Sequence, residues 1–131
     1  MLNIKNERKK ISDYGINFKD GDPKPKGTPD ELVKSAQDMY HELSPETGEF
    51  FDTMVNEELM DLVNRDGKRP GGFCTSFPKY DRPYIFSNFN GTSHDVDVLT
   101  HEAGHTFQFY RSLSQPILEY YVPTYEAAEI H

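Results

Sequence analysis

The chain has 131 residues, a length that suggests a single domain. Its 22 acidic residues outnumber the 14 Lys and Arg residues, and the resulting net charge of −8 argues against nucleic acid or an anionic membrane as a partner. No apolar stretch approaches a membrane span, the N-terminus lacks the apolar core of a secretory signal, and a single cysteine, Cys74, excludes an internal disulfide, so we expect a cytoplasmic protein.

Residues 1–27 form a polar lead-in that we expect to be partly disordered, because its second half is rich in Gly, Pro, Asp and Lys. The first helix is predicted over residues 29–43. Thr28 can serve as its N-cap, Pro29 fits its first position, and Glu31 follows Thr28 at the spacing of a capping box. Apolar residues then recur at the spacing of one helical face, as in an amphipathic helix.

A second helix is predicted over residues 45–63. Ser44 and the proline after it repeat the start signal, and apolar residues continue at helical spacing until the turn-forming residues 64–67. The character of the sequence then changes. Residues 71–89 are aromatic and β-prone, and the turn-like residues 78–82 divide them, which predicts a β-hairpin.

A further helix is predicted over residues 94–113, after the break at Asn90 and Gly91. The last helix is expected to begin at Pro123, since proline is favoured at the first helical position. Helices that flank one small hairpin indicate a mainly α fold with a small sheet, in the α+β class.

The most informative motif is HEAGH at residues 101–105. His101 and His105 are four residues apart, so on a helix they lie on one face and can bind one metal ion together. Glu102 is one step round the helix and can take a proton from a water molecule on that metal. The pattern H-E-x-x-H on a helix is typical of a zinc peptidase, although it also arises by chance on polar helix faces.

A catalytic zinc usually has three protein ligands and one position open to water. The residues alone leave four downstream candidates for the third ligand: Glu119, Glu126, Glu129 and His131. Asp97, one turn before His101, and Glu126 could orient the ligand histidines by accepting the free ring N–H. Either acid can equally be a solvated charge on a helix surface.

The hairpin suggests a place for a substrate. If the strand over residues 83–89 lies at the sheet edge beside the metal, an extended peptide can pair with it. The substrate-binding candidates are then Tyr84, Phe86, Asn88 and Gly91. The simpler alternative is a small sheet that only packs on the helices.

The remaining cysteine and histidines have plainer interpretations. Cys74 lies in an aromatic stretch and is expected to be a buried small hydrophobic residue rather than a nucleophile. A thiol enzyme that uses Cys74 is a weaker alternative. His41, His94 and His131 are expected to be surface or capping residues.

Four stretches resemble the oligoendopeptidase F family, the bacterial branch of the thimet-oligopeptidase-like zinc peptidases. They are KRPGGFC (68–74), PYIFSNFNGT (83–92), DVDVLTHEAGH (95–105) and PTYEAAEIH (123–131). The resemblance covers at least residues 68–131, and we expect it to extend over residues 14–131.

The resemblance implies a predominantly helical, zincin-like catalytic core with a small sheet beside a substrate channel. It implies one Zn2+ ion and hydrolysis of short peptides rather than folded proteins. His101, His105 and Glu129 match the family's zinc ligands, and Glu102 matches its catalytic base. Glu129 thereby becomes the expected third ligand.

The sequence departs from the family in length, because members are several times longer. Residues 28–131 therefore resemble a truncated catalytic core, in which the oxyanion-stabilising groups are not identifiable. The alternative to a zinc metalloendopeptidase is a catalytically incompetent fragment that folds, or self-associates through exposed aromatic surface, without hydrolysing peptides. Nine Phe and eight Tyr residues make such a homo-oligomer plausible.

Overall fold

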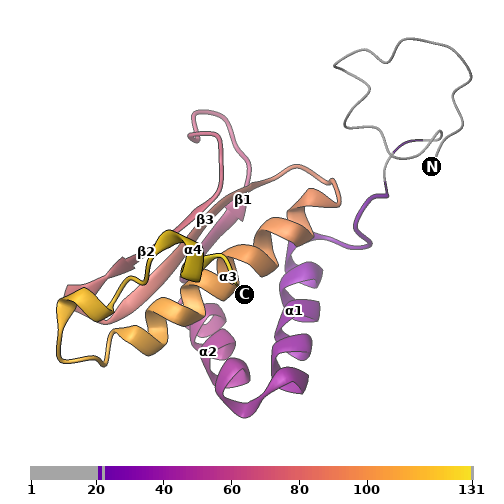
Figure 1. Ribbon diagram of the computed structural model, residues 1–131. Coiled ribbons are helices and arrows are strands. Elements are labelled where there is room, and N and C mark those ends of the chain that lie inside the picture. The colour runs from indigo at the N-terminus through magenta and orange to yellow at the C-terminus, as the bar shows by residue number, and fades with distance from the viewer. Residues whose placement is uncertain (1–20, 22, 131) are drawn as a thin grey trace, which may run out of the picture.

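A computed structural model describes residue 21 and residues 23–130, so most of the predicted lead-in over residues 1–27 lies outside the described residues. A small sheet carries α3 along one face, and α1 and α2 form a helical hairpin beside α3 (Figure 1), so the expected α+β class is confirmed. The elements are α1 Pro29–Leu43, α2 Pro45–Asn56, β1 Met60–Val63, β2 Phe73–Phe77, β3 Arg82–Phe89, α3 His94–Ser112 and α4 Tyr125–Ala128, with short 3-10 turns at Pro78–Tyr80 and Leu118–Tyr120.

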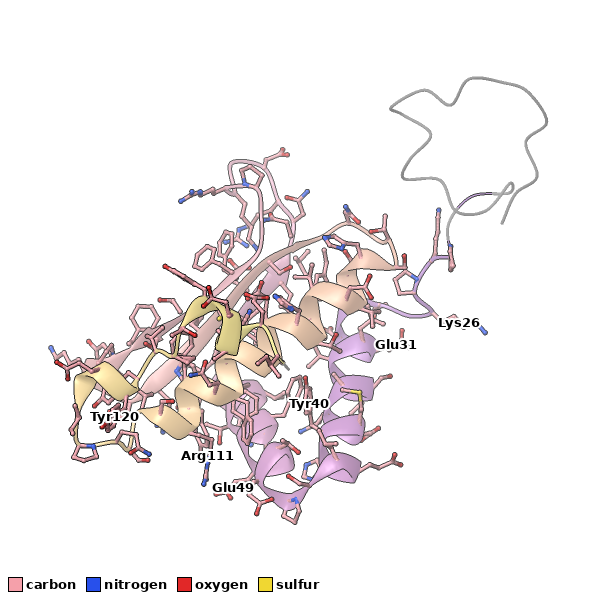
Figure 2. All side chains as sticks on the ribbon, in the orientation of Figure 1. Lys26, Glu31, Tyr40, Glu49, Arg111 and Tyr120 are labelled. Carbon is pink, nitrogen blue, oxygen red and sulfur yellow. The ribbon has the colours of Figure 1, made fainter. Side chains whose placement is uncertain are left out.

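The start of α1 has the predicted capping box. The Thr28 side chain accepts a hydrogen bond from the Glu31 backbone, and the Glu31 carboxylate accepts one of 2.7 Å from the Thr28 backbone. Further along α1, Tyr40 stacks on Phe51 of α2 at a centroid distance of 4.8 Å. The Tyr40 hydroxyl also donates to the backbone oxygen of Thr100 at 3.4 Å, so α1 is tied directly to α3 (Figure 2).

The predicted helix over residues 45–63 is wrong in its second half, because α2 ends at Asn56 and β1 follows it. The backbone closes α2 with two hydrogen bonds, from Glu58 N–H to Val55 and from Leu59 N–H to Met54, in the pattern of a Schellman motif. Glu58 has a φ of 53°, a left-handed conformation that glycine usually provides. Without glycine there, the sequence carries no stop signal.

The sheet has the order β1-β3-β2. Strand β2 pairs antiparallel with β3, as the predicted hairpin over residues 71–89 requires, and β1 pairs parallel with β3 on the other side. Strand β3 is therefore central. The expectation that residues 83–89 form an edge strand is wrong, and β2 and β1 are the edges.

The two faces of β3 differ in burial. Alternate side chains of β3 are buried: Pro83, Ile85, Ser87 and Phe89. Ile85 and Phe89 belong to the core, which continues through α2 and through Leu99 and Ala103 of α3. Tyr84, Phe86 and Asn88 project from the opposite face of β3. There Phe86 stacks on Phe73 at 5.0 Å, so this second face is aromatic and partly open to solvent.

The loop over residues 64–72 leads into β2 and is anchored to the sheet. The Lys68 side chain is only 2% exposed, and its Nζ donates to the Asp61 carboxylate at 2.9 Å and lies 4.5 Å from the centre of the Phe86 ring. Asn88 donates to two backbone carbonyls of the same loop. These contacts fix the point at which β2 begins.

Helix α3 agrees with the predicted span 94–113 to within one residue. Its apolar side turns Leu99 and Ala103 into the core, which leaves the histidines on a different side of the helix. The last helix begins at Tyr125 instead of Pro123 and comprises four residues, with Thr124 as its N-cap. Among the described residues, no helix is both long and apolar enough to cross a membrane.

Candidate metal centre

Two histidines of α3 face one another across a single helical turn. His101 and His105 are four residues apart, and their Nε2 atoms are 3.1 Å from each other. The His105 side chain is 14% exposed and the His101 side chain is 47% exposed, so the pair lies at the surface with one ring partly covered. The predicted common face is therefore present.

Glu129 completes the group from the far end of the described chain. It is the C-cap of α4, and its backbone N–H donates to Tyr125. Its Oε1 is 3.5 Å from His105 Nε2 and its Oε2 is 3.6 Å from His101 Nε2. One ligand atom from each of the three residues lies within 4.8 Å of the others, and we call this group the triad.

The spacing of the triad can be compared with the requirements of a metal ion. Tetrahedral coordination with bonds of about 2.0–2.1 Å separates neighbouring ligand atoms by about 3.3 Å. In the triad the two Nε2 atoms are 3.1 Å apart, and each lies 3.5 or 3.6 Å from a different oxygen of Glu129, while one ligand atom from each residue lies within 4.8 Å of the others. Two imidazole nitrogens and one carboxylate oxygen are also a common donor set for a divalent transition metal with one open position. The triad therefore fits one such ion.

Glu102 adjoins the triad. Its side chain is half-buried, and its backbone oxygen accepts a 2.5 Å hydrogen bond from the Thr106 hydroxyl of the next turn. The negative charge of Glu102 contributes to raising the pKa of Cys74 in β2, so its carboxylate lies near that edge strand.

The thiol of Cys74 is not suited to nucleophilic attack. Its burial, followed by the nearby negative charge of Glu102, raises the pKa of Cys74 to about 12. Since only the thiolate is an effective nucleophile, almost none is present at neutral pH. The geometry therefore supports the interpretation of Cys74 as a partly buried, unreactive residue and argues against a thiol enzyme.

The predicted supporting acids are not brought to the histidines. Asp97 and Glu126 are exposed, and within the described part of the chain neither carboxylate hydrogen-bonds a triad histidine. Glu119 is also exposed, in the 3-10 turn, and His131 lies outside the described residues. Among the described candidates for the third ligand, Glu129 is the residue that lies beside the two histidines.

His41 lies away from the triad. Its ring is hydrogen-bonded to Asp52 at 2.9 Å, which links α1 to α2.

The predicted substrate residues of β3 lie elsewhere. Tyr84, Phe86 and Asn88 project from the sheet face opposite to the core and α3, because side chains alternate along the central strand. Gly91, with a φ of 83°, forms the turn between β3 and α3. The first three residues therefore lie on the face away from the triad, and the structure does not bring them to it.

Sequence reasoning missed Asp95, which fixes the turn before α3. Its side chain is buried, and its carboxylate accepts hydrogen bonds from the backbone N–H of Asn90 at 3.0 Å and of Gly91 at 2.7 Å. The signal available in the sequence was an acidic residue in the first helical turn, directly after Asn-Gly. Asp95 thereby sets where α3 leaves the sheet.

We expect Asp95→Ala to destabilise the chain by about 1–3 kcal/mol, because it removes the acceptor of partly buried backbone hydrogen bonds from Asn90 and Gly91. The free energy of unfolding in urea measures the change. Asp97→Ala, two residues later on the exposed side of the same helix, is the matched control and should cost well under about 1 kcal/mol. Equal losses in the two variants would contradict this account of Asp95.

Two of the cavities that described residues line do not include a triad side chain. One of about 660 Å³ lies between α1, α2 and the outer edge of β1. The other, of about 570 Å³, lies between α3 and the segment around α4, on the side of Phe107 and Arg111. With the His101 side chain 47% exposed and the Glu129 side chain 59% exposed, the triad lies at the surface.

Comparison with known proteins gives a consistent result. Residues 10–131 match the model of peptidase family M3. A provisionally named oligoendopeptidase F from Bacillus anthracis str. Ames is 54% identical, with a TM-score of 0.90 over 95% of this chain and 23% of that chain. Another provisionally named oligoendopeptidase F is 59% identical, with a TM-score of 0.81 over 84% of this chain and 20% of that chain.

A structure of PZ peptidase A with an inhibitor is 56% identical, with a TM-score of 0.81 over 84% of this chain and 20% of that chain. The chain thus spans about a fifth of the length of these solved structures. A search among curated proteins found no significant match.

Proposed function

The chain belongs to peptidase family M3, and from this membership we propose that the triad holds one zinc ion for the hydrolysis of peptide bonds in short peptides. The observation that carries the proposal is the convergence of His101, His105 and Glu129, with one ligand atom from each within 4.8 Å of the others. The matched relatives named as oligoendopeptidases support the substrate class.

The proposed reaction assigns a separate task to each side chain. The triad residues bind the ion and leave one position open. A zinc ion, when bound, supplies Lewis acidity that lowers the pKa of a coordinated water to about 7 and polarises the scissile carbonyl. Glu102 accepts the proton that this water loses and delivers it to the leaving amine, because it is next in sequence to His101 and half-buried beside the triad.

The substrate is proposed to lie along β2. A strand at a sheet edge offers unpaired backbone groups with which an extended peptide can pair, and β2 is the edge strand that packs against α3. The Glu102 carboxylate adjoins β2 through Cys74. A peptide on that edge would pass near Glu102, a role that the sequence had suggested for the strand over residues 83–89.

The rival proposal is that this chain folds and binds metal but hydrolyses nothing. It is favoured by one observation, which is that two of the three triad side chains, His101 and Glu129, are exposed at the surface. A surface site excludes less water and holds a substrate less firmly. One oxyanion-stabilising donor is typically worth about a hundredfold or more in rate, so a chain without such donors would be a poor catalyst.

Cleavage of a quenched fluorescent peptide separates the two proposals. We expect the chain loaded with zinc to cleave the peptide, a chelator to abolish cleavage, and added zinc to restore it, because the triad is the proposed site of the reaction. Cleavage that survived the chelator but was lost on alkylation of Cys74 would instead indicate a thiol enzyme. A zinc-loaded chain without cleavage would favour the rival proposal.

Two further proposals concern the setting of the protein. We propose that it acts in the cytoplasm, where its single thiol stays reduced. We also propose that copies associate through the exposed aromatic side chains of the sheet, which include Phe73 and Phe77. Sedimentation at increasing protein concentration tests the association, and a strictly monomeric chain would contradict it.

A further inference from the structure

The relative direction of β2 and α3 follows from the path of the chain. Strand β2 runs antiparallel to β3, and α3 turns back along the sheet after β3, so β2 and α3 run in the same direction (Figure 1). A contact at the start of β2 fixes their relative position. A Cβ atom built on Gly72 would lie 3.1 Å from Cγ1 of Val98, so residue 72 lies against Val98.

Beyond that contact, two residues of β2 cover about the same distance as one turn of α3. Residues 72 and 74 point to the same side of the strand and are separated by about 7 Å, while one turn of α3 advances about 5–6 Å. Cys74 is therefore expected opposite the residue one turn after Val98, which is Glu102. The pairing of Cys74 with Ile85, which is fully buried, places both side chains on the core side of the sheet, toward α3.

The pKa of Cys74 agrees with this register, because it responds to the Glu102 carboxylate and to the hydroxyl of Thr106. Thr106 is fully buried one turn further along α3. Burial and the Glu102 charge keep the thiol protonated, since they raise the pKa of Cys74 to about 12. A protonated thiol has one hydrogen to donate, and a carboxylate only accepts.

We propose that Cys74 is a positioning residue for Glu102, whose thiol donates a hydrogen bond to the carboxylate and holds it against β2. The contact itself does not depend on the reaction. Its catalytic importance rests on the proposed function, because only a carboxylate that serves as proton acceptor must be held in one orientation. The expected consequence is an effect on kcat with little effect on KM.

The contact can be measured without any peptidase activity, because Cys74 is the only cysteine of the chain. We expect iodoacetamide at pH 8 to alkylate the folded chain on the order of a hundredfold more slowly than the urea-unfolded chain. Glu102→Gln should react severalfold faster than the native sequence, because it removes a negative charge beside the thiol without changing the side-chain shape. Asp97→Asn, an equal change of charge on the exposed side of α3, should react at the native rate.

The S–H stretching band in the infrared spectrum gives a second reading of the same contact. A single cysteine yields a single band, in a region where other protein groups do not absorb. We expect this band to lie at lower frequency in the native chain than in Glu102→Ala, where the acceptor is missing. A band at the same frequency in both, together with an unchanged alkylation rate in Glu102→Gln, would overturn the proposed hydrogen bond.

The positioning role is tested by two variants of the zinc-loaded enzyme. Cys74→Ala should lower kcat on the order of tenfold with KM nearly unchanged, and Cys74→Ser, which keeps a donor, should recover most of that loss. A Cys74→Ala enzyme with native kcat, or equal losses in both variants, would contradict a positioning role. If the native chain cleaves no peptide at all, the proposed function fails, whereas the alkylation and infrared results still decide whether Cys74 holds Glu102.

Discussion

Glu102→Gln is expected to lower peptide hydrolysis about a hundredfold to ten-thousandfold while zinc still binds at one ion per chain. The substitution keeps the size of the side chain but removes the group that accepts a proton from water. Glu102 does not belong to the triad, so the three proposed ligands remain in place. Cleavage of a fluorescent peptide and zinc content by atomic absorption, both measured on the same preparation, check the two halves of this expectation.

Glu126→Gln is the matched control for this experiment. Glu126 is an exposed acid of α4, three residues before Glu129, and its carboxylate makes no hydrogen bond to a triad histidine within the described residues. The control should keep both zinc and activity. Unchanged cleavage in Glu102→Gln would contradict the mechanism, and loss of zinc from that variant would mean that Glu102 is a ligand.

Glu129→Ala is expected to weaken zinc binding by more than about a hundredfold, since even the removal of a partner behind a metal ligand costs about 10–100-fold. The loss of zinc affinity should also appear as a loss of zinc-induced stabilisation of the folded chain. An ion that binds only the folded chain stabilises it by about 4 kcal/mol when its free concentration is a thousandfold above the dissociation constant. We expect thermal unfolding of the native chain to shift upward with zinc and the shift to be lost in Glu129→Ala.

Glu119→Ala provides the comparison for Glu129. Both residues are exposed acids near the end of the chain, but Glu119 lies in the 3-10 turn away from the histidine pair. Its variant should show the full zinc-induced shift. If Glu129→Ala retained the native affinity, the triad would be a chance approach of three side chains, and another residue would have to supply the third ligand.

The helices and the hairpin were largely predictable because their signals are local. The capping box at Thr28 and Glu31 identified the start of α1, and the Asn-Gly break at residues 90–91 placed the start of α3. Likewise, His101 and His105 share a face because they are four residues apart on one helix. Glu129 is different, because its approach depends on how two distant segments pack, and only family resemblance singled it out from the other acids.

The predictions that failed concern features that are determined by tertiary contacts. The apolar run after residue 56 is compatible with helix or strand, and pairing of β1 with β3 selects strand, while Glu58 adopts a left-handed turn without glycine. The same pairing makes β3 central, which moves the free edge to β2 and turns Tyr84 and Phe86 away from the triad. Periodicity within one segment cannot reveal such a partner.

The central claim is that His101, His105 and Glu129 bind a single metal ion, and X-ray absorption at the zinc edge tests it most directly. For the zinc-loaded chain we expect one ion with only nitrogen and oxygen neighbours at about 2.0–2.1 Å, and an imidazole signal corresponding to two histidines. The spectrum should change in Glu129→Ala. A sulfur neighbour at about 2.3 Å, which would implicate Cys74, or a spectrum of hydrated zinc without imidazole, would contradict the account.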